Sequence, residues 1–126
     1  QSKDYHQVRL ERKEGQIKQS IAYTLQETTY PVTTENLALI FKDEIYRIAD
    51  VQNVNFNIYD LQGNLIKSSK PRFRNDSISL HLDPVIIEML SNSVKKIYIL
   101  EDTAAGDKYH ASYTYINDDK YKPIGI

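Results

Sequence analysis

The first quarter of the chain carries apolar residues at helical spacing. They recur at intervals of seven, four and four positions, which places them on one helical face: Leu10, Ile17, Ile21 and Leu25. Good helix formers dominate residues 3–28, and Pro31 ends the predicted helix. Glu14 and Lys18 are spaced for an i,i+4 ion pair on it. Because its first two turns are mainly polar, the helix is predicted to project from the domain and to pair with a second copy of itself.

A second helix is predicted shortly after the first. Thr33 or Thr34 can cap its N-terminus, and Glu35 lies in its first turn, where the helix dipole favours a carboxylate. The apolar residues that follow are again at helical spacing, and this stripe is predicted to face the core: Leu37, Ile40, Phe41, Ile45, Ile48 and Ala49.

In the middle of the chain the pattern changes to period two. Alternate apolar residues predict a half-buried strand: Val54, Phe56 and Ile58. Residues 60–64 supply turn chemistry, and Gly63 can take a positive φ without steric cost. Residues 65–69 form the predicted partner strand, so this stretch is expected to be a β-hairpin. We interpret Asp60, Gly63 and Asn64 as residues that shape the turn rather than as a ligand cradle.

The second half of the sequence predicts one more helix and further strands. Residues 69–82 follow no regular pattern, whereas Asp83 followed by Pro84 is typical of a capped helix start. That helix is expected to end near Ser91, and strands are predicted over residues 95–102, 108–117 and 121–126. The element order predicts the α+β class, an antiparallel sheet with helical cover. We expect one domain over residues 1–126, with the long helix in residues 1–30 and the α+β core in residues 33–126.

Several segments of the chain match the features of one known family. They are Asn57-Ile58-Tyr59-Asp60, Gly63-Asn64-Leu65-Ile66, the helix after Asp83-Pro84, and KYHASYTYI ahead of KPIGI. Together with the long first helix, they resemble the PAS-like, Cache-type extracytoplasmic sensor domains of bacterial two-component sensor histidine kinases. The resemblance implies a five-stranded antiparallel sheet in the order 2-1-5-4-3, with the last strand between the first and the fourth. Here that strand begins near Tyr121 and is cut at Ile126.

The resemblance also implies a function. It implies a periplasmic domain of an inner-membrane sensor histidine kinase, which relays a stimulus through its first helix to a cytoplasmic phosphorelay. A start at Gln1 is interpreted as that of an excised or processed fragment, so membrane spans and kinase modules are expected in other parts of the parent protein. A homodimer is expected to form through the first helix.

Composition narrows the chemistry that the chain can perform. Its 126 residues carry a net charge of -1, which offers no basic face for nucleic acid. There is no cysteine, and His6, His81 and His110 lack the spacing of metal ligands, so no metal and no cofactor are predicted. No histidine is followed by Glu as in a phosphoacceptor box, and Gly-rich nucleotide-binding boxes are absent. The chain itself is predicted to be non-catalytic, and its parent to be a protein-histidine kinase.

Binding is therefore the predicted activity. In PAS-like sensors the ligand sits between one sheet face and the connector after the second strand, so the resemblance points to these residues: Arg72, Arg74, Tyr98, Tyr109, His110 and Tyr113. Guanidinium groups favour carboxylates or phosphates, and aromatic walls suit small molecules. Two hypotheses stay open: a sensor of a small-molecule or protein stimulus, and a protein-interaction domain without a small-molecule pocket. A third, a small enzyme, would need convergent titratable groups in one cleft.

Overall fold

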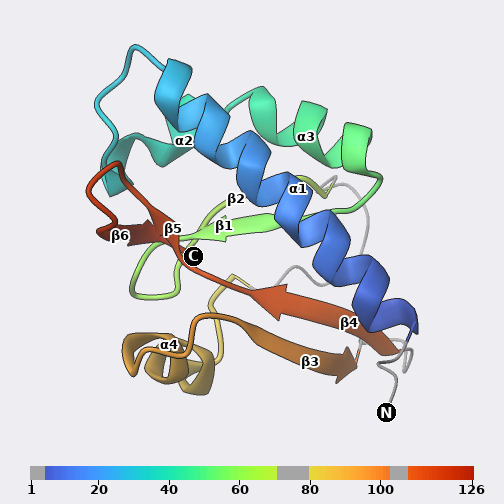
Figure 1. Cartoon of the computed structure of the whole chain (residues 1–126). Coiled ribbons are helices and arrows are strands. Elements are labelled where there is room, and N and C mark those ends of the chain that lie inside the picture. The colour runs from blue at the N-terminus through green and yellow to red at the C-terminus, as the bar shows by residue number, and fades with distance from the viewer. Residues whose placement is uncertain (1–4, 71–79, 103–107) are drawn as a thin grey trace.

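Helices lie on both sides of a layer of short antiparallel strands (Figure 1). The structure is a computed structural model that describes residues 5–70, 80–102 and 108–126. Its helices are α1 (Tyr5–Glu27), the short 3-10 helix η1 (Thr34–Asn36), α2 (Leu37–Ile40), α3 (Glu44–Gln52) and α4 (Pro84–Ser91). Its strands are β1 (Asn57–Tyr59), β2 (Leu65–Ser68), β3 (Ile97–Asp102), β4 (Lys108–Tyr113), β5 (Ile116–Asn117) and β6 (Pro123–Gly125). The predicted α+β class is confirmed.

The first helix does not project from the rest of the chain as predicted. α1 lies along the strands and packs against α3 and β4 (Figure 1). Its predicted apolar face is the side that packs, since Ile17 is buried and both Ile21 and Leu25 lie against the core. The projection was expected because the polar first turns offered nothing to bury, but polar side chains attach this part of the helix: Glu11 reaches Lys96 next to β3, and Glu14 reaches Ser112 of β4.

The second predicted helix is broken into three pieces: η1, α2 and α3. Residues 41–43 form a turn between α2 and α3, although no glycine or proline marks it in the sequence. Neither Thr33 nor Asp43 caps a helix with its side chain. The Thr34 hydroxyl instead donates a hydrogen bond of 2.7 Å to the Ile124 carbonyl, which ties this segment to β6.

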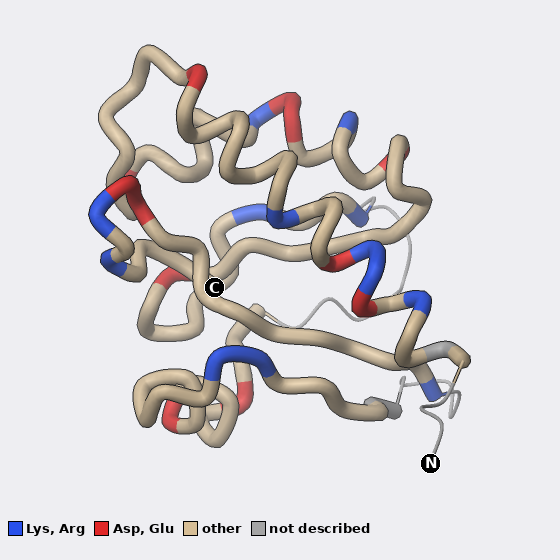
Figure 2. Tube along the Cα trace, viewed as in Figure 1, with Lys and Arg blue, Asp and Glu red and all other residues tan. Residues whose placement is uncertain are grey.

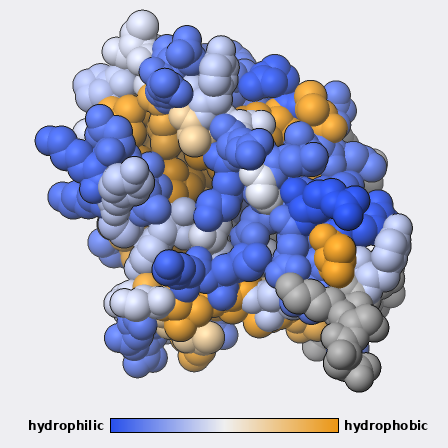
Figure 3. Space-filling view, viewed as in Figure 1, coloured by the Kyte–Doolittle hydropathy of each residue, from blue (hydrophilic) through white to orange (hydrophobic). Residues whose placement is uncertain are grey.

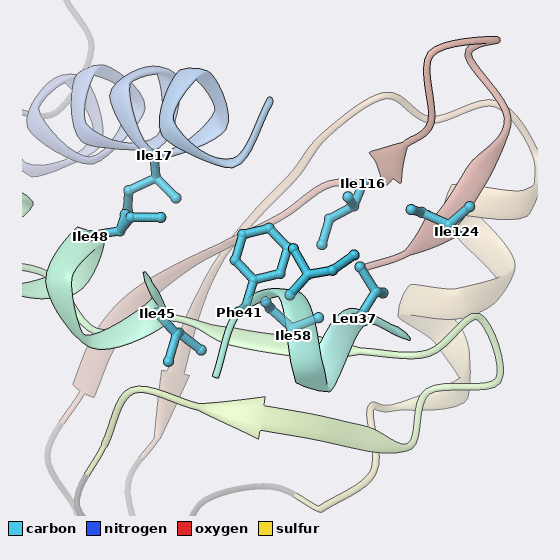
Figure 4. Packing of buried hydrophobic residues seen from close by; sticks show 9 residues of the cluster. Ile17, Leu37, Phe41, Ile45, Ile48, Ile58, Ile116 and Ile124 are labelled. Atoms are coloured by element: carbon cyan, nitrogen blue, oxygen red, sulfur yellow. The ribbon is translucent and has the colours of Figure 1, made fainter. Parts of the chain in front are cut away.

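The predicted apolar stripe nevertheless forms the main core. Phe41, Leu37 and Ile45 have no exposed surface, and the Phe41 ring lies in the middle of the cluster (Figure 4). Ile40 and Ile48 of the same stripe belong to the cluster, and side chains from distant parts of the sequence complete it: Ile17, Ile58, Ile116 and Ile124. This first cluster therefore joins α1, α2 and α3 to strands β1, β5 and β6.

The hairpin predicted in the middle of the chain is present. β1 and β2 pair antiparallel, and Gly63 has φ +92° in the turn between them. Asp60 Oδ1 accepts hydrogen bonds from the backbone N–H of Gln62 and of Asn64, at 3.0 and 2.8 Å. Both hydrogen bonds lie within the turn and hold its backbone in place. Asp60 thus shapes the turn, as predicted.

α4 covers the opposite side of the strands from α1 (Figure 1). It begins as predicted, because the Asp83 carboxylate accepts the Val85 N–H at 3.0 Å and Pro84 occupies the first turn. Its buried face belongs to a second apolar cluster: Tyr59, Leu82, Ile86, Leu90, Ile97 and Ile126. β1 separates the two clusters, because Ile58 faces the first and Tyr59 the second.

In the described residues the strands form three antiparallel pairs, β1–β2, β3–β4 and β5–β6, rather than a clear five-stranded sheet. The predicted strand over residues 108–117 is interrupted at Thr114 and Tyr115, which divides it into β4 and β5. Two backbone hydrogen bonds connect β1 of the first pair to the residue that follows β6 of the third. The N–H of Tyr59 donates to the Ile126 carbonyl, and the N–H of Ile126 donates to the Tyr59 carbonyl, both at 2.8 Å.

Candidate functional site

The predicted ligand-binding residues do not meet in one place. Arg72 and Arg74 lie outside the residues that the structure describes. The other four come from the β3–β4 pair, in which Tyr98 is opposite Ser112 and Ile97 is opposite Tyr113. Because side chains alternate along a strand, Tyr98 and His110 share the face toward α1, and Tyr109 and Tyr113 share the other face.

Tyr98 and His110 form a close pair on the α1 face. Their rings are stacked with centroids 5.4 Å apart and planes 16° apart, and the Tyr98 hydroxyl is hydrogen-bonded to His110 Nδ1. The pair is part-buried. Tyr113, by contrast, packs against the second apolar cluster, and Tyr109 is 46% exposed. Only two of the predicted ligand residues are therefore brought into direct contact.

The space beside α4 is occupied by apolar side chains. This is where the resemblance would place a ligand, but Leu82, Ile86 and Leu90 fill it together with Ile97 from β3. Val94 and Ile99 pack against the same cluster. Among the described residues, no group of polar side chains converges there.

The polar groups converge instead between α1 and the β3–β4 pair. Glu14 Oε2 accepts a hydrogen bond of 2.8 Å from the Ser112 hydroxyl, and Glu14 Oε1 lies 3.3 Å from Lys96 Nζ. Lys96 also reaches Glu11, at 3.3 Å. Lys18 donates to the Thr114 hydroxyl at 3.4 Å. The predicted Glu14–Lys18 pair is thus replaced by contacts with the strands.

Sequence patterns missed this interface for a clear reason. Lys96 and Ser112 lie more than 80 positions from Glu11 and Glu14, so no local spacing relates them. The one available signal was that Glu11 and Glu14 are three residues apart and so lie on the same side of a helix.

The charge of Lys96 is stabilised in this setting. Burial acts to lower the pKa of Lys96, but the hydrogen bond to Glu11 and the nearby charge of Glu14 outweigh it, so the pKa lies above its ordinary value. Lys96 therefore stays a cation facing two carboxylates at neutral pH.

Two hollows adjoin α1. An open groove of about 540 Å³ lies between α1 and α3, lined by Gln16, Tyr23, Glu44 and Arg47 among others. Its Glu44–Arg47 ion pair, at 2.8 Å, lowers the pKa of Glu44. A smaller cleft of about 190 Å³ runs beneath the first turns of α1 and is lined by these residues: Arg9, Leu10, Lys13, Val54 and His110.

The arrangement holds a helix on a sheet by polar contacts. Within residues 5–70, 80–102 and 108–126, no three histidine or acidic side chains gather as they would around a metal ion. No helix in this described part is both long enough and apolar enough to span a bilayer.

Comparison with known proteins adds no relative. No protein-family model, no curated protein and no solved structure matched this chain.

Proposed function

We propose that this chain is the periplasmic signal-input domain of a membrane-bound sensor histidine kinase, and that α1 is the element that carries the signal. The observation that carries the proposal is the position of α1. This 23-residue helix lies along the strand layer, contacts both α3 and β4, and leaves its outer face uncovered (Figure 1). A change in the strands or in the core would therefore reach α1 directly.

A PAS-like sheet is the finer fold that we propose for the strands. The mutual Tyr59–Ile126 bonds connect β1 to the end of β6, and β6 pairs with β5. β5 in turn continues the line of β4, which pairs with β3. The resulting order, β2-β1-β6-β5/β4-β3, corresponds to the 2-1-5-4-3 order of PAS-like sensors and supports the resemblance.

The cleft beneath α1 agrees with such a sheet. Ile126 is opposite Tyr59 on one side, and the β5–β6 register puts it opposite Tyr115 on the other. Val54 lies five positions before Tyr59, and His110 lies five positions before Tyr115. In an antiparallel sheet with this register, Val54 and His110 would therefore flank the same position of the central strand, and both line the cleft. In a PAS-like sheet, the position between these two residues belongs to the central strand.

The outer face of α1 is the surface that we propose for a homodimer. Ile17 and Ile21 on the inner face pack in or against the first apolar cluster and are not available for pairing, and the half-buried Leu10 lines the cleft beneath the helix. One set of its exposed residues recurs at alternating intervals of four and three, which is the spacing of a coiled-coil seam: Val8, Arg12, Gly15, Gln19, Ala22 and Gln26. Hydrophilic residues cover most of this side of the molecule (Figure 3). Because this seam is largely polar, two α1 helices could shift against each other at little cost.

A stimulus acts on this dimer only through different affinities for its two arrangements. The apolar filling beside α4 favours the second candidate function, a protein-interaction domain without a small-molecule pocket. In that case a partner protein, rather than a small molecule, would bind one of the two dimer arrangements more tightly than the other.

A thermal-shift screen of small acids, amino acids and sugars separates the two functions. A small-molecule sensor predicts a hit that raises the midpoint by several degrees, since a ligand at 100 times its Kd adds about 2.7 kcal/mol to the free energy of unfolding. The shift should be lost in Arg72→Ala or Arg74→Ala and kept in Lys42→Ala, a change of an exposed residue on the α2–α3 side. A screen without a hit would replace the small-molecule sensor by the interaction domain.

A further inference from the structure

The two halves of α1 are attached to the molecule in different ways. Residues 17–27 contribute Ile17, Ile21 and Leu25 to the first apolar cluster. Residues 5–16 contribute no buried side chain among those described, and Leu10 is the only half-buried apolar one. Figure 2 shows the same division, with Lys, Arg and acidic residues alternating along the first half and few charges along the second.

Polar contacts link the charged half to the rest of the described chain. Lys96, next to β3, bridges Glu11 and Glu14, and Ser112 of β4 donates to the second oxygen of Glu14. These three charged side chains are accessible to water, with exposed fractions of 38% for Lys96, 23% for Glu11 and 13% for Glu14. Lys13 adds a bond of 3.4 Å to the Asn53 carbonyl. Water and salt can therefore compete for every one of these contacts.

Gly15 lies at the boundary between the two halves. A glycine within a helix lowers helix stability, because it has more backbone freedom than any other residue. Apart from its chain neighbours and the backbone of its own helix, no described atom lies within 4 Å of the position that a Cβ on Gly15 would take, so close packing does not require a glycine here. Glycine is also a common site of helix bending. The weakest point of α1 thus coincides with the change from apolar to polar attachment.

We infer that residues 5–16 of α1 form a latch that opens from the β3–β4 pair about Gly15, with Lys96, Glu11 and Glu14 as its fastening. Opening leaves the apolar cluster intact, because residues 17–27 stay in place. As a signalling device the latch rests on the function proposed above, and it specifies how the lever moves. Its opening is nevertheless a property of the isolated chain, so the two ideas can fail separately.

Hydrogen exchange of the isolated chain, followed by mass spectrometry, tests the latch. The informative amides are those of residues 9–16, which have partners within the helix, compared with those of residues 18–27. Raising NaCl from about 0.02 M to about 0.5 M shortens the screening length from roughly 20 Å to roughly 4 Å. We expect this change to speed exchange in residues 9–16 by about 3- to 10-fold, the range for a small network of ion pairs, and to leave residues 18–27 unchanged.

Three variants make the test specific. Lys96→Gln should produce the fast exchange of residues 9–16 already at low salt. Gly15→Ala should slow it by about 2- to 5-fold, the effect of one helix-interior glycine. Arg47→Gln breaks the Glu44–Arg47 pair on α3 and should leave residues 9–16 unaffected.

Simple fraying predicts a different result. Protection would then fall residue by residue toward the N-terminus and would not respond to Lys96→Gln or to salt. That outcome, or equal acceleration of residues 9–16 and 18–27 in Lys96→Gln, would overturn the latch. Neither outcome bears on the ligand screen, which tests sensing.

Discussion

Replacing Phe41 with alanine is expected to lower the free energy of unfolding by about 3–5 kcal/mol, the range for a fully buried phenylalanine. Phe41 has no exposed surface and its ring lies among apolar side chains from helices and strands (Figure 4). Domains of ordinary stability unfold at a cost of about 5–15 kcal/mol, so this single change would remove a large share. Urea denaturation followed by far-UV circular dichroism measures it, since the chain has no Trp.

Leu39→Ala is the matched control for Phe41→Ala. Leu39 belongs to the same helical segment but is 51% exposed, so its removal should change stability by less than about 0.5 kcal/mol. A loss at Phe41 no greater than about 1 kcal/mol, the average for point substitutions, would contradict the position of its ring at the centre of the core.

Gly63→Ala is expected to destabilise the chain by about 2–4 kcal/mol, from backbone strain and overpacking together. Gly63 has φ +92°, which a residue with a Cβ adopts only under strain. The added Cβ would also lie 2.5 Å from Ile87 Cδ1 and 3.2 Å from His81 Cε1. The urea midpoint, compared with that of the unchanged chain, measures the loss.

The same substitution at Gly15 should have the opposite sign. Gly15 is helical and the space around it is open, so Gly15→Ala is expected to stabilise the chain by about 0.5–1 kcal/mol. If both alanine variants were equally harmless, the left-handed turn at Gly63 and its contact with Ile87 would be refuted.

The sequence predicted those parts of the fold whose signals are local. The spacing of apolar residues identified α1 and the core stripe around Phe41, because helical periodicity is set within a few turns. Asp60 with Gly63, and Asp83 with Pro84, marked a turn and a helix start through their own backbone preferences.

The parts that could not be predicted depend on distant residues. The break at residues 41–43 has no breaker in the sequence, and it lets α2 and α3 follow the strands beneath them. Glu14 was paired with Lys18 on local spacing, whereas the fold brings Lys96 and Ser112 to it. The strand was expected to be half-buried on the side of Ile58, but Tyr59 on the opposite side is buried too, because α4 covers that side as well.

The candidate site was the least predictable feature. Tyr98 and His110 do lie together, yet Tyr109 and Tyr113 point to the other face of the same two strands. Because side chains alternate along a strand, His110 faces away from the two tyrosines, and only the fold shows which helix covers each face. The polar contacts of α1 likewise depend on the position of this helix over the β3–β4 pair.

Disulfide crosslinking along α1 tests most directly whether this helix joins two copies of the chain and can carry a signal between them. Single cysteines at Val8, Gly15 and Ala22 on the outer face are predicted to crosslink efficiently under mild oxidation. Cysteines at Arg9 and Glu27, which are exposed at the side of the helix, should crosslink poorly. A uniform pattern over all five positions, or a chain that stays monomeric, would contradict the role of α1 as the element that carries the signal through a dimer.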